Sequence, residues 1–230
     1  MPELLRLCSK IDRLEVADWF AFTAPGSLTV NFEHAPQHAV DGKEELPVVK
    51  ALTLVGELVD LASLELHLAD VPLGDGGVEA LGAAFHDLRA LTSLRLDLTG
   101  SALSKEGAGH ILKAISTLQT IPVLDLSMSE ASVSLRATTD DTLVGKLSTV
   151  LSEVSGLKSL DLDLMHSQLA EHSISSVTQA IATRHSLMSL SVNCAQASFG
   201  AGGARALSEL ICQFSSSTRL ELDLAETAVG

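Results

Sequence analysis

The stretch "LTSLRLDLTGSALSKEGAGHILKAISTLQTIPVLDLSM", residues 91–128, begins the same pattern twice. The run SLRLDL at 93–98 returns thirty residues later as VLDLSM at 123–128. Strict alternation of apolar residues is typical of a strand with one apolar face. Between the two runs, Ile111 and Ile115 lie four residues apart, which places them on one face of a helix. The repeating unit is therefore strand, loop, helix and next strand.

This unit recurs along most of the chain, which is the pattern of a repeat protein. The apolar triplet begins at Leu28, Leu64, Leu94, Leu124, Leu160, Leu190 and Leu220, at intervals of 36, 30, 30, 36, 30 and 30 residues. The helical pairs recur with it: Ala51 and Val55, Leu81 and Phe85, Ile111 and Ile115, Leu147 and Leu151, Val177 and Ile181, Leu207 and Ile211. The two long units contain polar inserts at 34–45 and 136–141, which belong in surface loops. We expect an α/β fold with a parallel sheet of about seven strands and helices on one side.

The repeat resembles the leucine-rich repeat of the ribonuclease-inhibitor-like type over roughly residues 26–230. The matching positions of one unit are Leu66, Leu68, Leu73, Gly77, Leu81 and Phe85. The resemblance implies a solenoid, or horseshoe, with its helices on the convex side, and a fold that hosts many functions. The asparagine of the family is replaced here by Val71, Ser101, Ala131, Ser167, Ala197 and Thr227, so hydroxyl groups replace it in part.

A doubly wound nucleotide-binding fold is the rival interpretation, because "GDGGVEA" at 74–80 and "GAGGARA" at 200–206 look similar to a dinucleotide loop. Neither completes the motif, since Glu79 and Arg205 stand where the third glycine is required. The glycines also recur at one repeat position, which favours a structural role.

The two ends of the chain differ. Apolar spacing over residues 3–22 predicts a helix that caps the first strand, so we divide the chain into a capping helix at 1–25 and about seven repeats at 26–230, the last incomplete. No cap follows "RLELDLAETAVG" at 219–230. Since a terminal repeat normally needs one, we expect a fragment of a longer repeat array, a subunit of a larger complex, or an edge covered by a partner or a second copy.

Composition narrows the classes of partner. The net charge of −14 disfavours nucleic acid and anionic membranes, which are themselves polyanions, and leaves a basic protein partner open. Three cysteines at irregular spacing indicate a reducing compartment, so we expect an intracellular and cytoplasmic protein. Cys194 and Cys212 are expected to be buried and inert. The scattered histidines, including the pairs His34 and His38 and His166 and His172, provide no convincing metal site.

Alternation also predicts which residues of each strand point away from the core. The first outward column is Thr29, Glu65, Arg95, Asp125, Asp161, Ser191 and Glu221. The second is Asn31, His67, Asp97, Ser127, Asp163, Asn193 and Asp223. These columns place seven carboxylates and one arginine on one sheet face. A column of serines precedes them at Ser27, Ser63, Ser93, Ser159 and Ser189.

We predict a non-catalytic protein-interaction module or structural subunit, without cofactor or bound metal, that binds a basic partner through this face. The predicted partner-binding residues are Glu65, Asp97, Asp125, Asp161, Asp163, Glu221 and Asp223. Three alternatives stay open: the charges only keep the face hydrated, the chain is a purely structural subunit held through its ends and helices, or Asp161 and Asp163 hold a divalent cation in an enzyme. There are no tyrosines and one tryptophan, so few aromatic side chains are left for strong binding.

Overall fold

The structure is a computed structural model of the 230-residue chain, and it describes residues 17–32, 47–101, 103, 105–127, 142–165, 171–184, 186–197, 200–214 and 219–227. The polar inserts at 34–45 and 136–141 lie outside these residues, as do Cys8, Phe199, His34, His38 and His166. Within the described part the fold is α/β, with an eight-stranded sheet and six α-helices.

Each strand spans five residues and ends before a loop. The strands are β1 (Phe20–Ala24), β2 (Ser27–Asn31), β3 (Ser63–His67), β4 (Ser93–Asp97), β5 (Val123–Ser127), β6 (Ser159–Asp163), β7 (Ser189–Asn193) and β8 (Arg219–Asp223). The helices are α2 (Pro47–Gly56), α3 (Gly74–Asp87), α4 (Lys105–Ser116), α6 (Thr142–Glu153), α7 (Glu171–Ala182) and α8 (Gly200–Gln213). A short 3-10 helix, η1 (Ala17–Trp19), precedes β1. The predicted strands at all seven triplets are thereby confirmed as β2 to β8.

The strands lie in the sheet in the order in which they occur in the sequence, β1 to β8. Neighbouring strands from β2 to β8 are parallel, and each triplet pairs in register with the next, as Leu64 does with Leu94 and Leu94 with Leu124. A doubly wound sheet reverses its strand order at a switch point. This sheet does not, so the nucleotide-binding interpretation is wrong; Gly74 and Gly200 begin α3 and α8 with φ of 58° and 62°.

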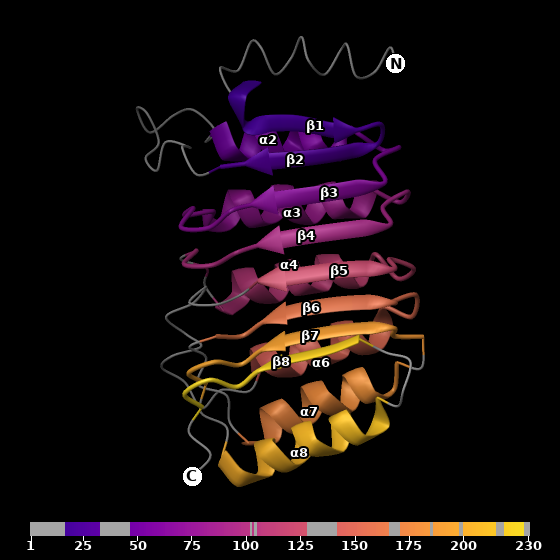
Figure 1. The fold of residues 1–230 in the computed structure, drawn as a ribbon. Helices are drawn as coiled ribbons and strands as arrows, with labels where there is room; N and C mark the ends of the chain where they lie inside the picture. Colours follow the sequence, from indigo (N-terminus) through magenta and orange to yellow (C-terminus); the bar gives the residue numbers. More distant parts are fainter. Residues whose placement is uncertain are drawn as a thin grey trace.

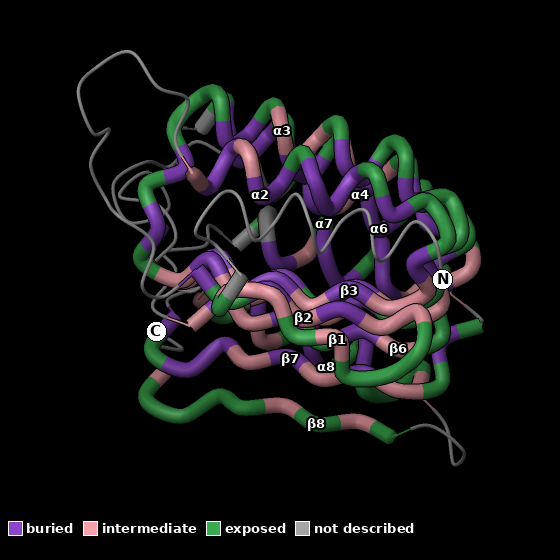
Figure 2. Tube along the Cα trace, turned by 90° about the horizontal axis from the view of Figure 1, so that it is seen from above, coloured by how far each residue is buried: buried purple, intermediate pink, exposed green. Residues whose placement is uncertain are grey.

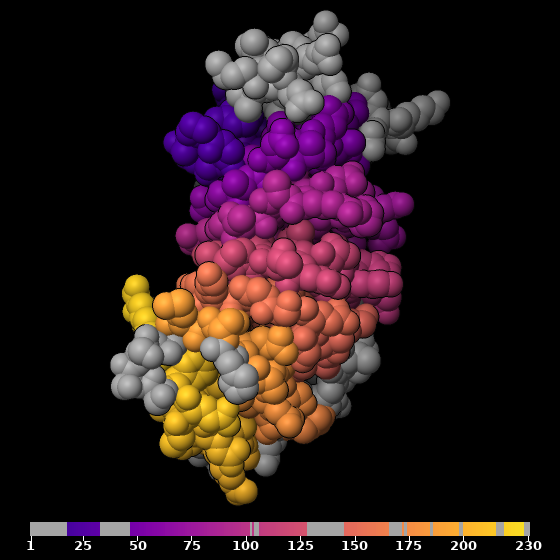
Figure 3. All heavy atoms as spheres, turned by 90° about the vertical axis from the view of Figure 1, so that its right-hand side faces the viewer, coloured from indigo at the N-terminus to yellow at the C-terminus, as the bar shows by residue number. Residues whose placement is uncertain are grey.

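The sheet and the helices form two layers, with all six helices on one face of the sheet (Figure 1). The buried residues of both layers face one another between them (Figure 2). Consecutive units form successive bands from one end of the molecule to the other (Figure 3). The inward apolar residues of β2 to β7 and the predicted helical pairs from Ala51 to Ile181 are buried in this single core, which confirms the predicted phase of five helices.

The turn after each strand uses backbone and hydroxyl groups in place of an asparagine. Asp70, Gly100, Gln196 and Glu226 share one repeat position and have φ from 55° to 63°. The hydroxyl groups of Ser101 and Thr227 donate to the carbonyl groups of Leu98 (2.6 Å) and Leu224 (2.8 Å). Ser101 is fully buried, so this bond satisfies a hydroxyl that water does not reach. The expected partial replacement by hydroxyls is present at these two positions.

The capping helix predicted over 1–25 is wrong at its C-terminal end. Residues 20–24 form β1, which pairs antiparallel with β2 through a turn at Pro25 and Gly26, and residues 1–16 lie outside the described part. Gly26 has φ of 75°, the conformation that a type II turn requires after proline. Trp19 meets Phe32 edge to face, with ring centroids 5.4 Å apart. A hairpin and an aromatic pair therefore cover the first repeat.

The last helix also differs from its prediction. Leu207 is buried as expected, and so is Leu210, whereas Ile211 is 41% exposed. Ile211 occupies the repeat position of Phe85 and Ile115, which a following helix covers. Within the described residues α8 has a helix neighbour, α7, on one side only, so the same position stays open to solvent.

Candidate functional site

The two outward columns lie in register across the sheet, on the face opposite the helices. In the first column, Glu65 pairs with Arg95, Arg95 with Asp125, Asp125 with Asp161, and Ser191 with Glu221. In the second column, His67 pairs with Asp97, and Asn193 with Asp223. The structure therefore brings all seven predicted partner-binding carboxylates onto one face, although their role in binding remains a prediction.

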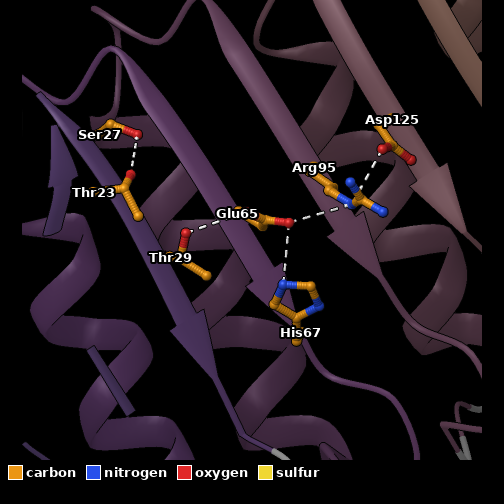
Figure 4. A network of polar contacts seen from close by, with 7 residues as sticks. All are labelled: Thr23, Ser27, Thr29, Glu65, His67, Arg95 and Asp125. Atoms are coloured by element: carbon orange, nitrogen blue, oxygen red, sulfur yellow. Dashed lines mark hydrogen bonds and ion pairs between the residues drawn. The ribbon is translucent and has the colours of Figure 1, made fainter. Parts of the chain in front are cut away.

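The first strands of this face carry a connected polar network (Figure 4). Arg95 lies between two acids, with its Nε 3.4 Å from Glu65 Oε1 and 3.2 Å from Asp125 Oδ2. Glu65 also contacts His67 Nε2 at 3.1 Å and accepts a hydrogen bond from the Thr29 hydroxyl at 3.1 Å. One guanidinium thus lies between two carboxylates and compensates half of their charge.

Asp125 is the carboxylate whose environment is most clearly perturbed. Partial burial raises the pKa of Asp125 above its ordinary value of 3.8, and Asp161, Glu65 and Asp97 raise it further, while Arg95 opposes them. Burial disfavours the charged form, and like charges nearby add to that effect. Ionisation of Asp125 is therefore less favourable in the folded protein than in the unfolded chain.

Asp161 on β6 lies next to Asp125 in the register but has no compensating cation. Its other cross-strand neighbour is Ser191. Within the described residues Asp161 accepts no hydrogen bond and forms no ion pair. Asp161 is exposed, and Asp163 shares its face two residues on. The unpaired negative charge of the sheet is accordingly centred on β6.

The second column has a structural task that the sequence analysis missed. Oδ1 of Asp97, Asp163 and Asp223 accepts a hydrogen bond from the backbone N–H two residues on, each at 2.9 Å, and Asn193 does the same at 3.0 Å. Such bonds close a turn at the end of each strand. The signal was available, because Asp or Asn recurs at this repeat position in five of the seven units. These three carboxylates keep one oxygen directed to the loop, so they are weaker candidates for binding than Asp161.

A second arginine on this face was also missed. Arg219 begins β8, at the repeat position that serine holds in most other strands, and its Nη2 lies 2.6 Å from Glu221 Oε1. The side chains of Arg219 and Glu221 point to the same side because they are two residues apart on a strand. The face therefore carries two guanidinium groups, and Glu221 is paired.

Of the two described cysteines, one is buried as predicted and the other is not. Cys194 is fully buried on the inner side of the sheet, and burial together with the nearby Asp163 raises the pKa of its thiol to about 12. Cys212 was expected to be buried and is exposed. The residues at the same repeat position in other helices, such as His86 and Ser152, are exposed as well, so adjacency to Ile211 in the sequence was a poor guide to burial.

The described residues contain no group of three or more histidine, cysteine or acidic side chains that could hold a metal ion. Asp161 and Asp163 share a face as predicted, but two ligands alone do not make a cation site. A hollow of about 470 Å³ lies elsewhere, between α7 and α8 on the helical side, and Arg205 and Glu209 are among its lining residues. In the part of the chain that the structure covers, every helix is too short or too polar to cross a bilayer.

Comparisons with known proteins identify no family for this chain. No protein-family model matches the chain, and no curated protein does. Among solved structures, it is similar to an internalin from Listeria monocytogenes, at 10% sequence identity and a TM-score of 0.37. The match covers 78% of this chain and 52% of the internalin, so the chain spans about half the length of that protein. A likeness of this size transfers neither a partner nor an activity.

Proposed function

We propose that this chain is a non-catalytic protein-interaction module of the leucine-rich-repeat type, and that its outward sheet face docks a basic protein surface. The in-register repeat and the resemblance of its sequence pattern support the repeat class. The proposed contact residues are Glu65, Asp97, Asp125, Asp161, Asp163, Glu221 and Asp223. We further propose an intracellular location, because Cys194 and Cys212 are both free thiols.

The single observation that carries the docking proposal is the uncompensated charge on β6. Glu65 and Asp125 share Arg95, and Glu221 has Arg219, whereas Asp161 has no cation among the described residues. A partner's lysine or arginine at Asp161 also reaches Asp125, because neighbouring strands are about 4.8 Å apart. We therefore centre the docking site on β5 and β6 and treat Glu65 as peripheral.

The chemistry of the face predicts fast, salt-sensitive association. Two exposed carboxylates one strand apart repel each other by roughly 1 kcal/mol in water, and a basic partner relieves this repulsion. Charge complementarity of this kind raises the association rate and the specificity more than the affinity. Screening shortens its range to about 8 Å at physiological ionic strength. The tyrosine-free sequence is consistent with a weak contact.

A purely structural subunit is the second candidate, and one observation favours it. Leu224 and Ile211 are 38% and 41% exposed at the β8 end, where the core is open. A subunit held through this end would bind independently of the acidic columns. Salt dependence therefore separates the two candidates.

The test is affinity capture from cell extract at low and at moderate salt with three forms of the chain. The face variant carries Asp125→Asn, Asp161→Asn, Asp163→Asn and Glu221→Gln. The matched control removes four exposed helical carboxylates instead: Glu79→Gln, Glu106→Gln, Glu153→Gln and Glu209→Gln. We expect a basic partner to be lost with the face variant and with salt, and kept by the control. Equal capture by all three forms would refute the acidic docking site.

A further inference from the structure

The outer edge of β8 has no strand beside it among the described residues, and the docking site proposed on β5 and β6 does not involve this edge. Within the described residues β8 has a single neighbour, β7. Its inward leucines are only partly buried, although the leucines at the same positions of β3 to β6 are at most 1% exposed. Figure 2 shows β8 at the margin of the molecule, with only intermediate and exposed residues. An edge of this kind is a template for pairing with another strand.

The backbone groups at this edge are directed outward at two residues. Arg219 N–H donates to Met188 O at 2.9 Å, and Asp223 O accepts from Cys194 N–H at 2.8 Å, so odd-numbered residues of β8 bond to β7. Because the direction alternates along a strand, Leu220 and Leu222 point their N–H and C=O groups away from β7. Within β8 itself, the edge therefore offers two donors and two acceptors.

The side chains of β8 are self-complementary in an antiparallel register. If two copies pair about a twofold axis at Glu221, Arg219 lies opposite Asp223 of the second copy at both ends of the strand. Leu220 then lies opposite Leu222, and these two residues exchange both of their outward hydrogen bonds. A register shifted by one residue would place leucines against the hydrated face. The two Glu221 side chains meet at the axis, each beside its own Arg219.

We propose that the β8 edge binds a second copy of this chain in this antiparallel register and forms a twofold dimer. The two sheets become continuous, and the partly exposed Leu220 and Leu222 of one copy pack beside those of the other. Opposite charges across neighbouring strands stabilise such a pairing, whereas like charges weaken it. An interface that uses one patch on both subunits is the commonest form of dimer. The dimer also places two acidic sheet faces side by side.

Exchanging the charges at positions 219 and 223 tests the proposed register. The readout is dimer formation by the 230-residue chain, whose monomer mass is 24.1 kDa, measured by analytical ultracentrifugation. Arg219→Asp and Asp223→Arg each place like charges opposite one another, so each raises the dimer dissociation constant about tenfold or more. The double variant Arg219→Asp with Asp223→Arg restores opposite charges and brings the constant back toward that of the unmodified chain. Asp97→Arg is the matched control, because Asp97 makes the same turn bond on β4, inside the sheet.

A disulfide cross-link tests the proposed antiparallel register independently of charge. Glu221→Cys, in a chain with Cys8→Ser and Cys212→Ser, places two thiols at the twofold axis, where opposite Cα atoms are about 4.5 Å apart and a disulfide fits. Ser191→Cys in the same background lies one strand inside the edge and forms no such bond. A monomeric mass at hundreds of micromolar, a dimer that neither single charge variant weakens, or equal cross-linking at both positions would each overturn the proposal.

Discussion

The two ends of the sheet carry the same repeat but bury it differently. At the first repeat, Leu28 and Val30 are fully buried beneath the β1 hairpin and the Trp19–Phe32 pair. At the last, Leu220 and Leu222 hold the same repeat positions and are partly exposed. The leucine pattern therefore decides which side of a strand faces inward, whereas burial depends on having a neighbour on each side.

Truncating one leucine at each end of the sheet should give the largest difference in stability loss between the two ends. Leu28→Ala is expected to lower the free energy of unfolding by about 2–5 kcal/mol, because it opens a cavity in a closed core. Leu220→Ala should cost about 1 kcal/mol, because solvent already reaches the side chain. Urea unfolding at a concentration where the chain is monomeric gives both values. Equal losses would mean that the β8 end is covered.

Thiol reactivity sharpens the comparison near the open end. The pKa of about 12 leaves Cys194 with roughly a thousandth of the thiolate of an ordinary cysteine, whereas Cys212 is exposed. In a Cys8→Ser chain at pH 8, a thiol reagent should therefore modify the exposed Cys212 first and Cys194 far more slowly. Mass spectrometry of the modified peptides measures both rates. Rapid modification of Cys194 would show that β8 opens readily.

The hairpin that closes the first end depends on one glycine. Gly26 has φ of 75°, and its carbonyl group accepts hydrogen bonds from Ala62 and Ser63 N–H, each at 2.9 Å. Gly26→Ala is expected to cost about 1 kcal/mol, because a side chain disfavours this conformation. Gly82→Ala in α3 is the control, and it should raise stability by up to about 1 kcal/mol since the added methyl group would lie 3.8 Å from Ala114 Cβ. Thermal unfolding of both variants checks the opposite signs.

The smallest expected effect concerns Asp125, midway between the two ends. Its raised pKa means that the folded protein binds this proton more tightly than the unfolded chain does. Its contribution to the free energy of unfolding therefore falls as the pH rises from about 3.8 through the raised pKa. Asp125→Asn should remove this loss and stabilise the protein at neutral pH by less than about 1 kcal/mol. Unfolding curves of both forms from pH 3 to pH 7 test the sign, and an Asn variant that is less stable at pH 7 contradicts it.

The seven parallel strands were predictable because alternation and the 30-residue interval are local properties of the sequence. β1 was not, because Phe20–Ala24 belongs to no repeat and continues an apolar spacing that fits a helix. Ile211 and Cys212 were misplaced for a different reason. Ile211 lacks, among the described residues, the following helix that covers Phe85 and Ile115. Cys212 holds a repeat position that is also exposed in other helices, as at His86 and Ser152.

The candidate site was predictable as a set of columns and not as a set of contacts. The sequence predicted that Asp125 and Asp161 lie side by side, and the register confirms it. It did not predict that Arg95 reaches both of its neighbours, since the reach of a long side chain depends on its rotamer. The turn role of Asp163 also requires the backbone of the following loop.

The most direct test of the acidic docking face is an NMR titration of the isotope-labelled chain with a short arginine-rich peptide. We expect the largest chemical-shift changes to cluster on β5 to β7, around Asp125, Asp161 and Ser191, and we expect Asp161→Asn with Asp163→Asn to remove most of them. Changes around Glu65 and His67 should be smaller, because Arg95 already occupies that part of the face. Chemical-shift changes that spread over the helices, or that the two substitutions leave unaffected, would contradict an acidic docking site on β5 and β6.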